Sequence, residues 1–180
     1  MNNSEASESL SGETVRHVIQ GSHVVSEDPS TVLTTILGSC VSACMWDPVA
    51  GIGGMNHFLL ARGADVGADG HRYGSHAMEL LINDMLKRGA LRRRLKVKLF
   101  GGAMIQNNFA RIGRQNAEFA LQFVKDEEFD LVSHSLLGTQ ARKVRFNPTT
   151  GSAQQKFLTD VESPPIVEPI HVAADDITFF

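Results

Sequence analysis

The chain has 180 residues, of which 42% are hydrophobic and 21% charged, and its formal net charge at pH 7 is -3. These values are typical of a single globular domain with a buried core, and the weak negative charge argues against a general affinity for nucleic acid. Two cysteines make no disulfide framework, and no apolar run is long enough to span a membrane. We therefore expect a cytoplasmic protein with no direct membrane insertion.

Residues 1–13 are rich in Ser, Glu and Asn, and they predict a disordered lead-in. The folded domain is expected over residues 14–158, beginning with a short strand around Val15, Val18 and Ile19. A loop over residues 26–30 then leads into the central stretch, Thr34 to His57, which contains both cysteines and the only Trp.

This central stretch predicts two strands joined by a short connection. An apolar run from Val41 to Trp46 precedes the turn residues Asp47-Pro48 and Gly51, and a second strand-like run continues to Leu59. If the two strands pair, Cys40 and His57 lie side by side although they are 17 positions apart.

A cysteine beside a histidine suggests nucleophilic catalysis, because an imidazole that takes the thiol proton produces the reactive thiolate. In a continuous extended run Thr34 shares a face with Cys40, whereas Thr35 points away. Cys44 lies within the apolar run and is expected in the core. By spacing alone, the alternative remains open that Cys40 is a small buried residue and His57 a structural histidine.

Further along, residues 61–74 are rich in Gly, Asp and Ala and predict a loop that either shapes substrate access or simply connects two elements. A helix is expected from Ser75 to Arg88, with Ser75 as N-cap and Gly89 as its stop. Its buried stripe comprises Met78, Leu81, Ile82 and Met85. His71 and His76 near its start are expected at the surface and not as a metal pair.

A basic cluster follows, with seven Lys and Arg residues between Lys87 and Lys98. Either it docks an acidic partner, or it is the solvated end of the helix and the wet side of a strand over residues 95–99, where Lys alternates with apolar residues. No aromatic residue interleaves with it, which argues against a platform for single-stranded nucleic acid. Gly101-Gly102 predicts a turn or a close backbone contact.

A second helix is expected from Arg114 to Asp126, with Gly113 just before it and apolar residues on two sides. Strands are predicted over residues 129–134 and 142–146, and a closing edge strand over residues 155–158. Residues 159–180 carry five acidic residues and no Lys or Arg, which predicts a disordered acidic tail. This tail is a peptide ligand for a partner, a mask over the basic cluster, or inert.

The segments LGSCVSACMWDPVAGIGGMNHFLL, RYGSHAMELLINDMLKRGA, LKVKLFGGAMI, IGRQN and RKVRFNPTTG together resemble the CheD family of chemoreceptor glutamine deamidases, in the family's order. Position by position, the resemblance places the family's nucleophile on Cys40, its base on His57 and its supporting threonine on Thr34. The chain departs from the family pattern at two places. The family commonly has Pro just after the HFLL run and a Gly-Gly run near residues 135–138, and this chain has neither.

The resemblance implies an α+β fold, a layered β-sandwich of mixed strands flanked by two main helices, similar to cysteine-dependent deamidating toxins. It implies hydrolysis of glutamine side chains on the cytoplasmic helices of chemoreceptors, through a thioester and without metal or organic cofactor. Thr34 then orients His57 or binds the substrate amide. A CheC-type phosphatase is an implied partner where the organism has one.

Three alternatives remain at this point. The chain is a docking or regulatory module of chemotactic adaptation without chemistry, or it is a thiol protease or transglutaminase that uses the same dyad. Hydrolysis of receptor methylesters, which is also associated with the family, is a further activity that the sequence leaves open.

Overall fold

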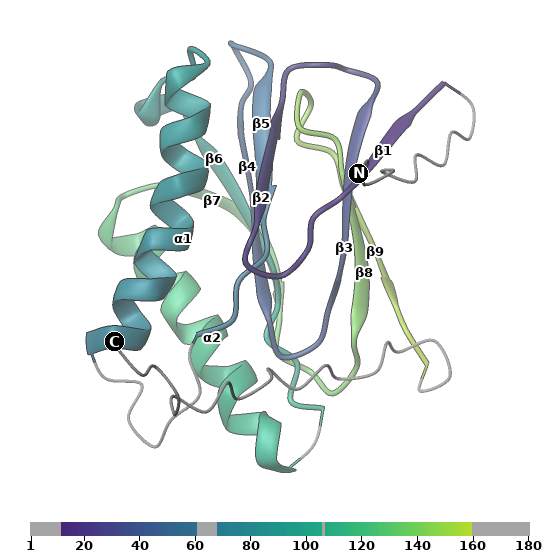
Figure 1. Cartoon of the computed structure of the whole chain (residues 1–180), viewed down its shortest axis with the longest axis vertical. Helices are drawn as coiled ribbons and strands as arrows, with labels where there is room; N and C mark the ends of the chain where they lie inside the picture. Colours follow the sequence, from purple (N-terminus) through teal and green to yellow (C-terminus); the bar gives the residue numbers. More distant parts are fainter. Residues whose placement is uncertain (1–11, 61–67, 106, 160–180) are drawn as a thin grey trace, which may run out of the picture.

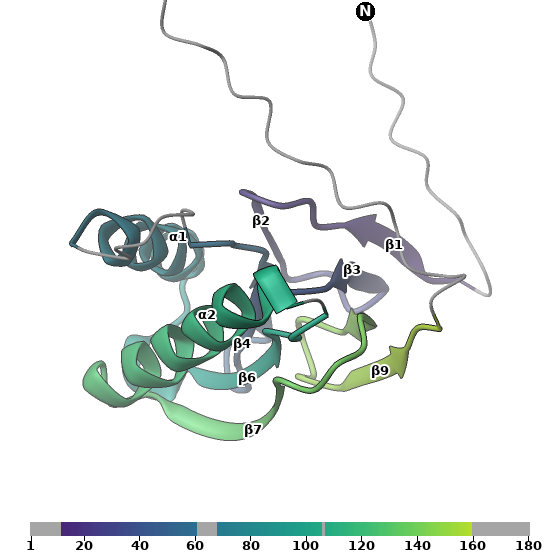
Figure 2. The ribbon, with the colours of Figure 1, turned by 90° about the horizontal axis from the view of Figure 1, so that it is seen from below.

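The computed structural model describes residues 12–60, 68–105 and 107–159. Two β-sheets stack face to face, and two helices cover the outer face of the larger sheet (Figure 1). Seen from below, the order of layers is helices, five-stranded sheet, four-stranded sheet (Figure 2). The expected class, a layered α+β sandwich of mixed strands flanked by two helices, is confirmed.

The four-stranded sheet has the order β1-β3-β8-β9. Its strands are β1 (Thr14–His17), β3 (Thr31–Leu37), β8 (Arg142–Phe146) and β9 (Ala153–Phe157). β1 pairs with β3 in parallel and the other pairs are antiparallel. The expected closing strand is thus an edge strand, β9.

The five-stranded sheet has the order β2-β5-β4-β6-β7. Its strands are β2 (His23–Ser26), β4 (Val41–Asp47), β5 (Ile52–Asn56), β6 (Lys96–Gly101) and β7 (Asp130–Leu136). The predicted hairpin is confirmed, because β4 and β5 are antiparallel neighbours. A short 3-10 helix, η1 (Arg92–Arg94), precedes β6.

Helix α1 (Ala68–Lys87) is longer than predicted. Its stripe of Met78, Leu81, Ile82 and Met85 is completely buried, as expected, and the positive φ of Gly89 ends it. The predicted start was wrong, because Ser75 lies inside the helix and is not its N-cap. Residues 68–74 are helical, and residues 61–67 of the expected loop lie outside the described residues.

Helix α2 (Asn107–Asp126) also begins earlier than predicted. Gly113 is an interior residue of this helix, where a Cβ atom would lie 2.3 Å from the Ala103 carbonyl oxygen. The glycine permits close packing and does not mark a boundary. Phe119 and Phe123 are both buried, so the expected second apolar side of this helix is confirmed.

Two apolar layers hold the fold together. The layer between the helices and the larger sheet contains the α1 stripe together with Val41, Phe58 and Leu99. The layer between the two sheets contains Leu33, Cys44, Trp46 and other residues. The described elements run from Thr14 to Phe157, whereas the predicted lead-in, up to residue 11, and the tail, from residue 160, lie outside the described residues.

Candidate active site

Cys40 and His57 lie at one end of the layer between the two sheets. Val41 and Phe58 exchange two backbone hydrogen bonds, of 3.0 and 2.9 Å, just beyond the β4–β5 ladder. Val41 follows Cys40 and Phe58 follows His57, so this pair brings the segments that carry the two candidate residues side by side. The prediction that pairing of the two strands brings them together agrees with this register.

Three hydrogen bonds fix the connection that carries Cys40, because three successive carbonyl groups of this connection each accept one. The N–H of Ala103 donates to the carbonyl of Gly38 at 2.8 Å, and that of Gly102 donates to the carbonyl of Cys40 at 2.7 Å. The side-chain amide of Asn116 donates to the carbonyl of Ser39 at 3.0 Å. The backbone of this turn is therefore fixed, and the Cys40 side chain is half-buried.

The predicted close contact of Gly101-Gly102 is confirmed at this turn. Gly101 has φ +111°, and a Cβ atom there would lie 2.1 Å from the Cys40 carbonyl oxygen. Glycine is required because a side chain would overlap the backbone of Cys40.

Asn116 joins the Cys40 turn to the segment that follows His57. Its carbonyl Oδ1 accepts the N–H of Leu60 at 2.7 Å, while its Nδ2 donates to the carbonyls of Ser39 and Ile112. The residue is completely buried. Sequence reasoning assigned it no role, although it lies in the IGRQN segment that supported the resemblance.

His57 is buried, with 8% of its surface exposed, and its two ring nitrogens have different surroundings. Nδ1 lies 2.9 Å from Thr35 Oγ1 and 3.4 Å from the Val18 carbonyl oxygen. The Thr35 hydroxyl donates to that same carbonyl at 2.7 Å, so it has no second proton for the imidazole. The hydrogen bonds therefore assign the proton to Nδ1 and leave Nε2 as the basic nitrogen.

Nε2 of His57 is buried and has no hydrogen-bond partner among the described residues. Burial lowers the pKa of His57 to about 4, although the hydrogen bond to Val18 acts in the opposite direction. The imidazole is thus neutral near pH 7, with an unused lone pair in a buried position.

The structure places Thr35, and not Thr34, against the imidazole. Thr34 Oγ1 donates to the carbonyl of Val144 at 2.8 Å, on the neighbouring strand β8. The parity expectation was wrong because β3 ends at Leu37 and Cys40 lies in the connection to the other sheet. The alternation of side chains along β3 therefore does not continue through Gly38 and Ser39 to Cys40.

The second cysteine is in the core, as expected. Cys44 is completely buried between the two sheets, and burial raises the pKa of its thiol to about 12. Such a thiol is protonated at any physiological pH and is a poor nucleophile.

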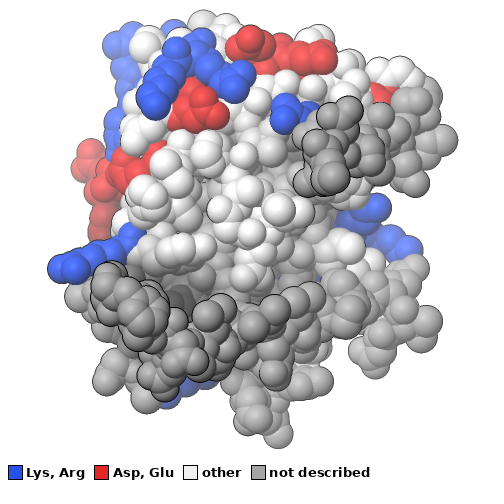
Figure 3. Space-filling view, in the orientation of Figure 1, with Lys and Arg blue, Asp and Glu red and all other residues white. Residues whose placement is uncertain are grey.

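The basic cluster is largely neutralised within the molecule. Five of its seven members are engaged, in ion pairs or with a carbonyl, namely Arg88, Arg92, Arg94, Lys96 and Lys98. In Figure 3, blue and red surfaces lie next to one another at the upper edge of the molecule. These contacts favour the interpretation as a solvated surface over that of a docking patch.

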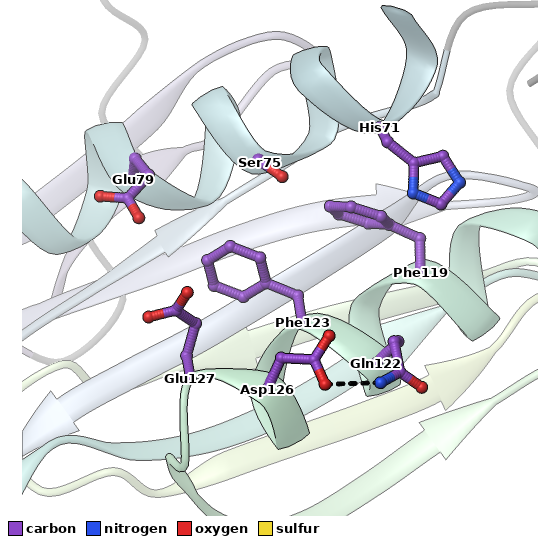
Figure 4. A pocket seen from close by; sticks show the side chains of 8 residues that line it. All are labelled: His71, Ser75, Glu79, Phe119, Gln122, Phe123, Asp126 and Glu127. Atoms are coloured by element: carbon purple, nitrogen blue, oxygen red, sulfur yellow. Dashed lines mark hydrogen bonds between the residues drawn. The ribbon is translucent and has the colours of Figure 1, made fainter. Parts of the chain in front are cut away.

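A groove between α1 and α2 is lined by other residues (Figure 4). Phe119 and Phe123 form its floor and Glu79, Asp126 and Glu127 add carboxylates. Neither cysteine lines it, so it offers no thiol chemistry. Within the described ranges, no group of three metal-binding side chains is present and no helix is long and apolar enough to cross a membrane.

Comparison with known proteins identifies close relatives. Chains called probable chemoreceptor glutamine deamidase CheD are 50% identical in Cereibacter sphaeroides, over 100% of this chain and 92% of the relative, and 51% identical in Agrobacterium fabrum, over 91% and 95%. A similarly named chain of Rhizobium leguminosarum is 54% identical over 82% of both. A solved Neisseria meningitidis protein, NMB0706, aligns with 71% of this chain and 63% of its own at 10% identity, with a TM-score of 0.43.

The family described as CheD, chemotactic sensory transduction, matches residues 61–157. This match spans more than half of the chain, and the relatives named above extend it over the segment that contains Cys40 and His57. The chain therefore belongs to the CheD family.

Proposed function

We propose that this protein hydrolyses glutamine side chains of chemoreceptors to glutamate, with Cys40 as nucleophile and His57 as base. The names of relatives at about 50% identity support the reaction and its substrate. The observation that carries the mechanism is the neutral His57 imidazole, whose Nε2 has no partner among the described residues, in a segment that pairs with the one following the half-buried Cys40.

In the first half of the reaction, Nε2 of His57 takes the proton of Cys40, and the thiolate attacks the carbonyl carbon of the substrate amide. The C–N bond then breaks, and the imidazolium returns its proton so that ammonia leaves. In the second half, neutral His57 activates a water molecule that hydrolyses the thioester, which leaves glutamate and the free thiol.

The developing oxyanion needs hydrogen-bond donors that are already in position. The carbonyls of residues 38–40 are all turned toward Gly102, Ala103 and Asn116. We propose that amide N–H groups of this same turn face the substrate. Because the turn is fixed before substrate arrives, the donors require no rearrangement.

Thr35 orients the base in this proposal. Its hydroxyl lies between Nδ1 of His57 and the carbonyl of Val18, so it fixes the tautomer and would stabilise the imidazolium as an acceptor. Thr34, which the resemblance implicates, supports the site from β3 through its bond to Val144. Pairing with a CheC-type phosphatase and a cytoplasmic location stay predictions.

The test is receptor deamidation by the wild type beside Cys40→Ala, Cys44→Ala and His57→Ala, measured by receptor mass. We expect Cys40→Ala and His57→Ala to lose at least about 1,000-fold in rate and Cys44→Ala to stay active. Activity that survives in Cys40→Ala would end the proposal. An unchanged receptor mass with wild type would favour a docking module, and peptide cleavage or amine incorporation would favour a protease or transglutaminase.

A further inference from the structure

The turn between β1 and β2 carries a glutamine to the proposed nucleophile. The N–H of Ser22 donates to the carbonyl of Ile19 at 3.1 Å, and Gly21 has φ +83°. This is the geometry of a type II turn, in which the third residue is normally glycine. Gln20 is the exposed residue at the tip of the turn.

The same turn is attached to the backbone of His57 on both sides. The N–H of Gly21 donates to the carbonyl of His57 at 2.7 Å, and the N–H of His57 donates to the carbonyl of Ser22 at 3.0 Å. The position of Gln20 is therefore set by the backbone of the proposed base.

The thiol of Cys40 donates a hydrogen bond to Oε1 of Gln20 at 3.3 Å. The group on the thiol is thus a glutamine carboxamide, which is the functional group that the proposed reaction consumes. We propose that Gln20 is an internal stand-in for the substrate: in the resting enzyme its carboxamide occupies the position of the substrate amide at Cys40. This inference rests on the proposed function, and an incoming glutamine must displace Gln20.

Two consequences follow for the resting enzyme. A hydrogen bond from the neutral thiol to a carbonyl oxygen stabilises the thiol against the thiolate. It also directs the proton toward Gln20 and away from Nε2 of His57. The side chain of Gln20 is exposed and one such bond contributes little free energy, so the substrate can displace it. Until then, the Cys40 thiol is less reactive toward other electrophiles.

The contact is made at the amide oxygen and not at the carbon. Deamidation of Gln20 itself would need the sulfur above the carbonyl carbon, followed by loss of ammonia and hydrolysis of the thioester to give glutamate. We therefore expect residue 20 of the purified protein to remain glutamine.

The first test is the rate at which iodoacetamide alkylates Cys40 in the full-length protein at pH 7, followed by intact mass. We expect Gln20→Ala to react about 3- to 10-fold faster than wild type, because the bond that holds the thiol proton is gone. Gln20→Glu should gain nothing, because a carboxylate beside the sulfur opposes the thiolate.

Two controls complete this test. Gln155→Ala removes an exposed glutamine from β9, on the other sheet, and should leave the rate unchanged. Cys40→Ala reports the background from Cys44. A Gln20→Ala rate equal to or below that of wild type would overturn the inference, and so would a mass showing that residue 20 has become glutamate.

The second test uses receptor as substrate. Removal of an internal competitor should lower the KM of Gln20→Ala by a factor similar to the alkylation effect and leave kcat unchanged. A raised KM would mean that Gln20 helps to bind substrate, which would contradict the inference. If the wild type fails to deamidate receptor at all, the proposed function fails, whereas the alkylation rates are measured without substrate and are judged separately.

Discussion

The two thiols of this protein lie four residues apart in sequence but in opposite environments. Cys44 is inside strand β4, enclosed between the sheets, and burial raises the pKa of its thiol to about 12. Cys40 is half-buried and lies just before the same strand, in a connection where the carbonyls of residues 38–40 all accept hydrogen bonds. The difference shows that access and a fixed backbone, more than residue type, separate the proposed nucleophile from a core residue.

Among substitutions outside Cys40 and His57, the largest effect is expected from Gly101→Ala, which displaces the backbone next to Cys40. A methyl group there would lie 2.1 Å from the Cys40 carbonyl oxygen, so the turn must shift. A displacement of about 1 Å costs on the order of 100-fold in rate, and receptor deamidation measures it.

The matched control is Gly51→Ala. Gly51 also has a positive φ, of +64°, but nothing lies within 4 Å of its would-be Cβ. We expect destabilisation of about 1 kcal/mol and unchanged activity. Equal losses of activity in both variants would show that backbone strain, and not displacement of the turn, is responsible.

Burial of His57 should make the free energy of unfolding depend on pH. The unfolded chain binds a proton on His57 near pH 6.5, whereas the folded protein does so only near pH 4. Protons therefore favour the unfolded state in this window. The free energy of unfolding should fall by up to about 3 kcal/mol as the pH is lowered from 6.5 to 4.

Urea denaturation at several pH values measures this slope, and His57→Gln supplies the comparison. The variant should lose much of the slope between pH 4 and 6.5. Asp47, whose pKa is lowered from 3.8 to about 2, contributes to the slope only at the acidic end of this window. An undiminished slope in His57→Gln would place the titrating group elsewhere.

A smaller effect is expected from Asn116→Asp, which breaks one side of the link between the Cys40 turn and Leu60. The carboxylate still accepts the N–H of Leu60 but cannot donate to the carbonyl of Ser39. We expect kcat to fall about 10-fold with KM little changed. Gln122→Ala, on the exposed side of the same helix, should retain full kcat, and equal losses would argue for a general effect on α2.

The smallest effect is expected from Leu137→Gly, behind the same turn. Leu137 has φ +66°, and its N–H donates to the carbonyl of Gly101. The residue is 36% exposed, so only part of its packing is lost. Glycine should relieve the backbone strain and raise stability by about 0.5 to 1 kcal/mol, visible as a higher Tm. A lower Tm would show that the side chain contributes more than the strain costs.

Periodicity predicted most of the strands and the buried stripe of α1, because these features depend on neighbours close in sequence. The helix starts were wrong for one shared reason. Gly74 and Gly113 suggested boundaries, whereas each is an interior residue that allows close approach of Phe119 or Ala103. A glycine placed for tertiary packing carries no local signal that distinguishes it from a turn residue.

The candidate site was likewise predicted only in part from the sequence. Cys40 and His57 were predicted from the resemblance, and the bridge between Val41 and Phe58 agrees with the predicted hairpin. Thr35, Gln20 and Asn116 were assigned no role, because their contacts join segments 17 to 77 residues apart. The sequence also gave no indication that the run from Thr34 to Cys40 crosses from one sheet to the other, which decides which threonine meets the imidazole.

The two connections that carry Gln20 and Cys40 both step from the smaller sheet to the larger one. The turn of Gln20 is bonded to the His57 backbone and Cys40 directly precedes β4, so both sides of their contact are attached to the larger sheet. The reaction of Cys40 with iodoacetamide thus reports on the local fit of these two connections and not on the alignment of the two sheets.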